Sequence, residues 1–457
     1  MARARASRPK TVADAVHGLG EGWSGDARLV RGSWMTIRFA NGRIHQPHFE
    51  RSTWVSLRAA HDRRLATATT VDASPEGLAS VATAARGLAT IAPRERRFPG
   101  FPSARGAPPR PVAFSASTAR ISPEAAVRIA ERILAAAEEE APGARIAGAV
   151  NFGAESLRVV NSAGLDRATA SSLAQASVLV DRPDRDPPVS AWAEGGHWDA
   201  SRLDAAKLGR EAARLPSEAP APVEPGAYRV VLRGPAMAEL LAFLASLGFS
   251  GHGEEEGWSC LRRQRGRRIA PEFVSLVDDP RSRETVPQAI DYEGTATRPL
   301  GLLRNGIAGP AVTDLVTAAR LGRPLTGHAP PPEAPAGEAG PVPGHLFLSA
   351  GDADEAELIR ETRRGLLVTR FHYVRVVDPG RGIITGMTRD GTYRIEHGEI
   401  VGPARNLRFT ESVLTALRGI ELLGKERRIY PSERAGSVAT TPAALVGEFR
   451  FTSATLF

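Results

Sequence analysis

From residue 33 to residue 70 the chain alternates apolar and polar positions in two runs, and Asn41-Gly42 stands between them. A period of two is typical of strands with one buried face, and Asn-Gly is a preferred dipeptide of tight hairpin turns. The pattern therefore predicts an antiparallel hairpin. The next run has helical spacing and predicts a helix over residues 74–91, with Ser74 as its N-cap.

A second block of elements follows the same logic. Ser122 opens a predicted helix that reaches about Glu140, and strand-like runs fill residues 145–182. A further helix is predicted over residues 202–215. The proline-rich segment after it has the composition of a linker.

The segment from Tyr228 to Cys260 combines a strand, a helix and a turn. After the strand Tyr228–Leu232, apolar residues recur at helical spacing from Met237 to Leu247. The helix runs into three closely spaced glycines. Potential metal ligands then follow within nine residues: His252, Glu254, Glu255, Glu256 and Cys260.

The remainder of the chain alternates strand-like runs with turn signals. A helix is predicted to end at Gly322, and another to end before Gly365. Asp390-Gly391 and His397-Gly398 are predicted hairpin turns. The sum indicates an α+β fold, with a mixed N-terminal domain and an antiparallel, strand-rich C-terminal domain.

Length and composition suggest how these elements are divided. A chain of 457 residues exceeds what one hydrophobic core usually serves, so two domains are expected. We place the boundaries as follows: a basic tail and lead-in at 1–32, an N-terminal domain at 33–221 with a Pro/Arg-rich connector at 92–112, and a C-terminal domain at 222–457 with a Pro/Gly-rich loop at 323–344.

Charge and cysteine content narrow the functional classes. The formal net charge is +8, but no aromatic interleaving or recognition module accompanies the arginine-rich patches, which does not favour nucleic acid as partner. One cysteine excludes an intramolecular disulfide and a cysteine-based zinc framework. No secretory signal and no membrane-spanning run is found, so we expect a cytoplasmic protein that does not bind membranes.

The ligand set after the helix is the one dense group of metal-binding residue types in the sequence. Zinc hydrolysis needs three fixed protein ligands, an open position for water and a carboxylate base. His252 can supply one ligand, but no second histidine lies in its own helix. The alternative is a solvated turn of glutamates with Cys260 as a small apolar residue, and the sequence favours this alternative.

The segments that carry a family resemblance lie mostly between Tyr228 and Ala329. They are VDDP (277–280), IDYEGTATRPL (290–300), LLRNGIAGPAVTDLVTAARLG (302–322) and TGHA (326–329). In this order and spacing they resemble the TldD/PmbA family, in which TldD and TldE (also called PmbA) form a heterodimeric metalloprotease. Weaker similarity covers most of the rest of the chain.

The resemblance also indicates what is missing. The family's catalytic subunit carries HExxxH in this helix and a cysteine ligand near the C-terminus. In one register Leu247 and Gly248 replace the first histidine and the glutamate, and only His252 remains. In the other register Ala242, Phe243 and Leu247 occupy the three positions, and in neither does a cysteine follow Cys260. Leu247, Gly248 and His252 are therefore interpreted as vestigial metal-site positions.

What the resemblance implies is a TldE-like, catalytically silent subunit of a metallopeptidase. No cofactor is expected in this chain, and zinc is expected in the partner. The partner is a TldD-like subunit or a second copy of this chain, and the substrates are extended peptides. Residues near the vestigial site are candidates for peptide contact in the chamber: Glu254, Glu255, Arg265, Arg267 and Arg268.

Two rival hypotheses remain open at this level. One is a self-sufficient metalloprotease that uses His252 with ligands that spacing does not identify. The other is a protein associated with DNA or gyrase, suggested by the net charge of +8 and by the family's description as gyrase modulators.

Overall fold

The protein is described by a computed structural model covering residues 10–104, 113–184, 186, 188–216, 218–331, 340–431 and 437–455. Parts of the predicted tail, of the 92–112 connector and of the 323–344 loop lie outside these residues. Among the residues that the structure describes, no helix has both the length and the apolar character that crossing a membrane requires.

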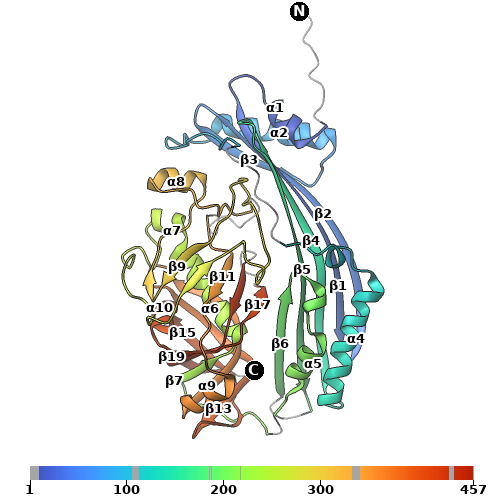
Figure 1. The fold of residues 1–457 in the computed structure, drawn as a ribbon, viewed down its shortest axis with the longest axis vertical. Helices are drawn as coiled ribbons and strands as arrows, with labels where there is room; N and C mark the ends of the chain where they lie inside the picture. The colour runs from blue at the N-terminus through green and yellow to red at the C-terminus, as the bar shows by residue number, and fades with distance from the viewer. Residues whose placement is uncertain are drawn as a thin grey trace, which may run out of the picture.

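Long antiparallel strands form one side of the molecule (Figure 1). In chain order they are β1 (Ser24–Ala40), β2 (Arg43–His61), β3 (Arg64–Thr70), β4 (Arg145–Asn161), β5 (Asp166–Arg182) and β6 (Val189–His197). The hairpin predicted at Asn41-Gly42 is confirmed, because both residues have positive φ between β1 and β2. A second turn at Asp62-Arg63, which lacks glycine, also has positive φ and starts β3.

The regular structure begins earlier than the sequence indicated. A short helix α1 (Val12–His17) and the first part of β1 lie within the stretch assigned to the lead-in. Asp26 and Arg28 obscured the strand because both are charged yet buried, at 1% and 5% exposure. Their charges are paired inside the fold, since Asp26 accepts from Arg28 and from Arg58.

Helices cover one face of the long strands. The predicted helices are confirmed as α2 (Pro75–Ile91) and α4 (Pro123–Glu140), with N-caps Ser74 and Ser122 that accept from the amides of Gly77 and Ala125. Helix α5 (Ala205–Ala213) packs against α4 and the sheet. Gly209 permits this close packing, because a Cβ there would lie 2.4 Å from the carbonyl oxygen of Ile133. Two short elements complete this half: α3 (Ala116–Ala119) and the 3-10 helix η1 (Ala200–Arg202).

The sheet continues beyond β6 into strands from the C-terminal half. Its further members, in spatial order, are β17 (Arg428–Pro431), β18 (Val438–Thr441), β11 (His345–Leu348), β8 (Leu276–Asp278), β9 (Leu300–Arg304) and β10 (Ile307–Ala308). Within the described residues the sheet has 12 strands. Within this sheet the two halves join at a narrow seam, where Gly196 of β6 pairs with Ile429 of β17. The domain boundary near residue 222 stays a prediction.

A second sheet lies wholly in the C-terminal half. Its strands are β12 (Gly365–Asp378), β7 (Gly226–Leu232), β19 (Ala444–Ala454), β15 (Leu407–Ser412), β13 (Ile383–Glu396), β14 (Glu399–Pro403) and β16 (Ile420–Leu423). It closes on itself because β12 pairs with both β7 and β13. The rings of Phe371, Phe409 and Phe449 pack against one another within its core. The α+β class and the strand-rich C-terminal half are thus confirmed.

The remaining helices pack around the two sheets. They are α6 (Gly234–Phe249), α7 (Gly251–Glu255), α8 (Leu315–Leu321), α9 (Glu355–Thr362) and α10 (Val413–Arg418). The predicted stop at Gly322 is confirmed, since its φ of 62° is left-handed. After α9, however, Arg363 takes the positive φ, and Gly365 is already the first residue of β12.

One predicted hairpin turn is wrong. Asp390-Gly391 lies inside β13, at a register shift opposite Thr369 of β12. Both residues have positive φ, and a Cβ on Gly391 would lie 2.4 Å from Oγ1 of Thr369. A β-bulge needs the same backbone freedom as a tight turn, so local sequence does not distinguish the two. The turn at His397-Gly398, between β13 and β14, is confirmed.

Candidate functional site: a cavity between the two halves

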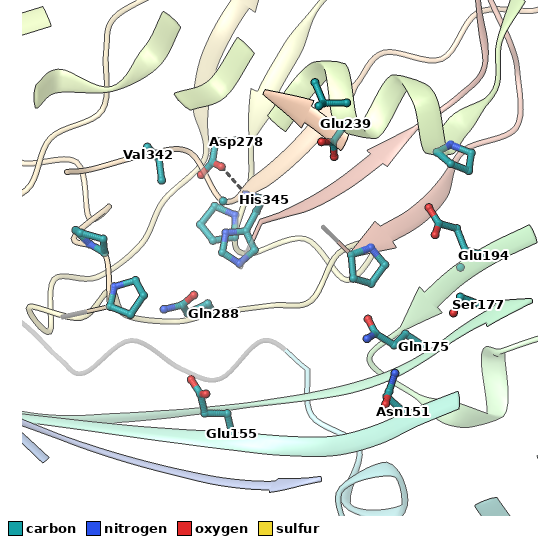
Figure 2. Close-up of a pocket in the computed structure, with 18 of the residues that line it drawn as sticks. Asn151, Glu155, Gln175, Ser177, Glu194, Glu239, Asp278, Gln288, Val342 and His345 are labelled. Atoms are coloured by element: carbon teal, nitrogen blue, oxygen red, sulfur yellow. Dashed lines mark hydrogen bonds between the residues drawn. The ribbon is translucent and has the colours of Figure 1, made fainter. Parts of the chain in front are cut away.

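A cavity of about 1170 Å³ is lined by residues of both halves (Figure 2). Strands β4, β5 and β6 supply one wall. The opposite wall comes from α6, β8, β12 and the loops around residues 288–297 and 327–345. Its volume exceeds the roughly 300–1,000 Å³ of pockets for drug-sized ligands, which suits a longer, extended molecule.

The sheet wall is polar because strand residues alternate between faces. On β5, Ala174, Ala176 and Val178 are buried toward α4 and α5. Their neighbours Gln175 and Ser177 face the cavity. Pairing aligns Gln175 with Asn151 of β4 and Ser177 with Glu194 of β6. The wall thus presents amide, hydroxyl and carboxylate groups in register, as Figure 2 shows.

A buried aspartate–histidine pair lies on the opposite wall. Nε2 of His328 is 2.9 Å from Oδ2 of Asp278, and Nδ1 is 3.1 Å from the carbonyl oxygen of Thr326. Asp278 also accepts from the amide of His345 at 2.7 Å. Burial opposes ionisation of Asp278, but the His328 ring and the His345 amide outweigh it and hold the pKa of the carboxyl below its usual range. The contact joins the loop that carries His328 to strand β8.

Two further carboxyls of the lining hold protons more tightly than usual. Burial and the nearby Glu293 charge raise the pKa of Asp291 to about 7, although three backbone amides donate to its oxygens. Burial also raises the pKa of Glu155, and a hydrogen bond from the Tyr292 hydroxyl partly offsets the increase.

The predicted vestigial site lies in and after helix α6, which is packed on nearly every side. Leu247 and Gly248 are buried, and a Cβ on Gly248 would lie 2.8 Å from Cδ1 of Leu261. In the alternative register Ala242 and Phe243 are also buried in the apolar core. Neither register offers a ligand atom from α6, so the segment does not fit a zinc ion.

His252 stands on α7 beside Glu255 and Glu256. Their ligand atoms lie within 4.8 Å of one another, and no other such group of three occurs in the part of the chain that the structure describes. Glu255 is 3.2 Å from the guanidinium of Arg320, and Glu256 is exposed. None of the three lines the cavity.

The other predicted contact residues serve the packing of this corner. Glu254 is 8% exposed and accepts from Arg265 and Arg323. Arg265 also donates to the carbonyl oxygens of Gly248 at 2.7 Å and Gly309 at 2.9 Å. Its guanidinium is thus engaged inside the fold.

Arg267, Arg268 and Cys260 also lie away from the cavity lining. Arg267 is exposed, and exposed Arg268 donates to the carbonyl oxygen of Asn305 at 2.8 Å. Cys260 is buried, which raises the pKa of its thiol to about 12. The structure therefore separates the predicted contact residues from the cavity. Sequence reasoning did not find the groups that do line it, such as Glu155, Glu194 and Glu239.

Fold and sequence together place the chain among metallopeptidase-like proteins. The family model described as PmbA/TldA metallopeptidase C-terminal domain matches residues 225–453, and that described as PmbA/TldA metallopeptidase domain 1 matches residues 25–89. The chain belongs to the PmbA/TldD family.

Relatives agree with this assignment over part of their length. The chain is 28% identical over 244 residues to a metalloprotease of Methanothermobacter thermautotrophicus, an alignment covering 51% of each chain. It is 26% identical over 171 residues to a zinc metalloprotease TldD homolog of Saccharolobus solfataricus, covering 36% of this chain and 37% of the relative. The matches thus span about half or less of these relatives.

Solved structures extend the similarity to the whole fold. The crystal structure of TldE from Thermococcus kodakarensis superposes with a TM-score of 0.85 and 19% identity, covering 97% of this chain and 99% of that one. A Thermotoga maritima protein described as a candidate modulator of a DNA gyrase gives a TM-score of 0.79 at 19% identity, covering 96% and 99%. At such identities the similarity shows the fold.

Proposed function

We propose that the chain is the non-catalytic, TldE-like subunit of a cytoplasmic metallopeptidase complex. It acts with a TldD-like, zinc-bearing subunit on extended or unfolded peptides. The observation that carries the proposal is the apolar burial of α6 where the first histidine and the glutamate of HExxxH would stand in either register: Leu247 is 5% exposed and Phe243 0%. A catalytic zinc site needs three ligands and an open water position, which this packing does not provide.

The cavity supports a role in holding peptides. Extended backbones bind well to open strand edges, where main-chain hydrogen bonds give affinity without demanding one sequence. β12 pairs with β7 only over Gly365–Val368, whereas residues 370–375 of the same strand line the cavity. On this proposal a peptide lies along this side of β12, facing the polar groups of β4, β5 and β6. The cleavage chemistry belongs to the partner.

Reconstitution tests the division of labour. The chain is purified alone, then mixed with a TldD-like protein from the same source, and hydrolysis of an unfolded fluorescent protein substrate is followed. We expect activity only when the TldD-like subunit is present, and co-elution of the two chains on gel filtration. A variant of the TldD-like subunit without its HExxxH glutamate is the control and should abolish activity.

Metal analysis decides between this proposal and a self-sufficient enzyme. We expect less than stoichiometric zinc in the isolated chain, and no change in the His252→Ala variant. Stoichiometric zinc that disappears in His252→Ala, together with peptidase activity of the chain alone, would refute the proposal.

A second candidate function is suggested by the net charge of +8 and by the gyrase-modulator description of one structural relative. Binding to DNA through phosphates falls steeply as salt rises. Retention on double-stranded DNA at physiological salt, with a slope that reports several phosphate contacts, would favour this function over the peptide-holding one.

A further inference from the structure

The cavity has a charge opposite to that of the whole chain. The formal net charge of the protein is +8, yet the described lining includes five carboxyl groups and two guanidiniums, and it stays acidic when Asp278, held by His328, and Asp291, with its raised pKa, are left out of the count. The carboxyl groups are those of Glu155, Glu194, Glu239, Asp278 and Asp291, and the guanidiniums are those of Arg370 and Arg375. In a cleft with low-dielectric walls such an excess concentrates the electrostatic potential and attracts ligands of the opposite charge.

Three of the acids come from three different elements and surround the open space. Glu155 belongs to β4, Glu194 to β6 and Glu239 to α6, and each is half-buried. Figure 2 shows Glu239 on the side of α6, opposite Glu155 and Glu194 on the strands. Because they lie on opposing walls, one extended ligand in the cavity can approach all three.

One of the two guanidiniums of the lining has its charge compensated by a carboxylate outside it, whereas Arg375 offsets one negative charge of the excess. Arg370 forms its ion pair with Asp390, a residue that does not line the cavity. Exposed Arg375 donates to the carbonyl oxygen of Val374 at 3.1 Å. The cavity wall also contains an internal example of guanidinium binding, since Arg370 stacks over the ring of Trp192 at 3.9 Å. Aromatic rings beside carboxylates are well suited to hold basic side chains.

We propose that the cavity selects peptide segments that carry lysine or arginine side chains, with Glu155, Glu194 and Glu239 as the specificity-determining residues. The inference rests on the proposed peptide-holding function and adds the chemical class of the substrate. Backbone pairing along β12 would hold an extended segment, and its basic side chains would meet carboxylates on both walls.

Binding by the isolated full chain tests the inference without any partner. Fluorescent peptides of eight residues, identical except for three alternate positions occupied by Lys, Gln or Glu, are titrated by anisotropy at physiological salt. We expect the Lys peptide to bind at least tenfold more tightly than the Gln peptide, and the Glu peptide to bind most weakly. In the triple variant Glu155→Gln/Glu194→Gln/Glu239→Gln the preference for Lys should fall at least tenfold.

A matched variant controls for the general effect of charge. Glu131→Gln/Glu139→Gln/Glu361→Gln changes three exposed glutamates outside the cavity by the same formal charge. It should keep the preference for Lys. The three cavity single variants, checked by circular dichroism and thermal unfolding, keep the test valid if the triple variant does not fold, because each should lose part of the preference.

The outcomes separate this inference from the proposed function. Equal binding of all three peptides, or equal loss of preference in the control triple variant, would overturn the charge selection while leaving a role in peptide holding. A Lys preference that depends on the cavity glutamates would support the inference even if the TldD-like partner added no peptidase activity, a result that would instead contradict the proposed function.

Discussion

The two ends of helix α6 have different surroundings. The first turns of α6 reach the cavity through Pro235 and Glu239, whereas its last turns, with Leu247 and Gly248, are buried in an apolar core. The same element therefore supplies a polar wall at one end and only packing at the other. The difference teaches that one helix can contribute to a cavity wall at one end and only to an apolar core at the other. Variants and measurements at the packed side and at the cavity side test this difference separately.

The largest effect is expected when the first histidine and the glutamate of HExxxH are introduced at the packed end of α6. Leu247→His with Gly248→Glu places two polar side chains in a core where even a Cβ on Gly248 approaches Leu261 to 2.8 Å. Burying such groups without partners costs several kcal/mol, so we expect a loss of about 3–5 kcal/mol and no gain of zinc. Urea unfolding and metal analysis measure both.

Leu247→Met is the control for the packed end, since a volume-conserving swap usually costs less than about 1.5 kcal/mol. If the double variant kept wild-type stability and bound one zinc ion per chain, the packed end would have room for a zinc site. That result would contradict the expectation from its packing.

A somewhat smaller effect is expected at the ion pairs that follow the helix. Glu254 is buried and accepts from Arg265 and Arg323, so Glu254→Ala leaves the largely buried Arg265 guanidinium without its carboxylate partner. We expect a loss of about 3 kcal/mol in the free energy of unfolding. The exposed neighbour Glu256→Ala should cost less than about 0.5 kcal/mol. Similar losses in both variants would contradict a structural role specific to Glu254.

The cavity side responds to pH through Asp291. The pKa of this carboxyl is raised to about 7 in the fold, so the folded state binds a proton that the unfolded state has already lost. Its contribution to stability is full below about pH 4 and is lost as pH rises through 7, by at most ~1.4 kcal/mol per unit of pKa difference. Asparagine does not titrate, so Asp291→Asn should lack this decrease in stability as pH rises.

Urea unfolding at intervals from pH 4 to pH 8 measures the difference between wild type and Asp291→Asn. The amide of Ala329 donates to Oδ2 of Asp291, so the asparagine variant has a constant cost from its own amide group there. That cost does not vary with pH. The quantity to compare is therefore the slope of the free energy of unfolding against pH. Parallel curves would show that Asp291 does not titrate in this range.

The smallest effect is expected at the single cysteine. Cys260 is 7% exposed, and burial raises the pKa of its thiol to about 12. Since the thiolate is the reactive form, a thiol reagent at pH 8 should leave the folded protein unlabelled over an hour and label it fully in denaturant. Rapid labelling of the native chain would indicate that this corner opens readily.

Local signals predicted much of the fold. Ser74 and Ser122 with their following prolines identified two helices, and Asn41-Gly42 identified the first hairpin, because caps and tight turns depend on neighbouring residues. The error at Asp390-Gly391 has the same origin, since a bulge and a turn use the same local chemistry.

The cavity depended on information that the sequence does not carry locally. Gln175 faces Asn151 only through strand register, and Glu239 meets this wall only through the packing of the two halves. Conversely, Arg265 lies close to the vestigial motif in sequence, but tertiary contacts direct its charge to Glu254. The structure places Arg265 away from the cavity lining, and its predicted contact with peptides stays a prediction.

The seam between β6 and β17 has a consequence for folding during synthesis. β6 ends at His197 and β17 begins at Arg428, so about 230 residues must be synthesised between the two strands. At roughly 5–20 residues per second, the outer edge of β6 at Gly196 stays without its strand partner for on the order of 10–50 s. An uncovered strand edge invites association with other chains. Ribosomal pausing or premature release before residue 428 should therefore produce aggregates, and a chaperone that shields nascent strands should raise the yield of this protein.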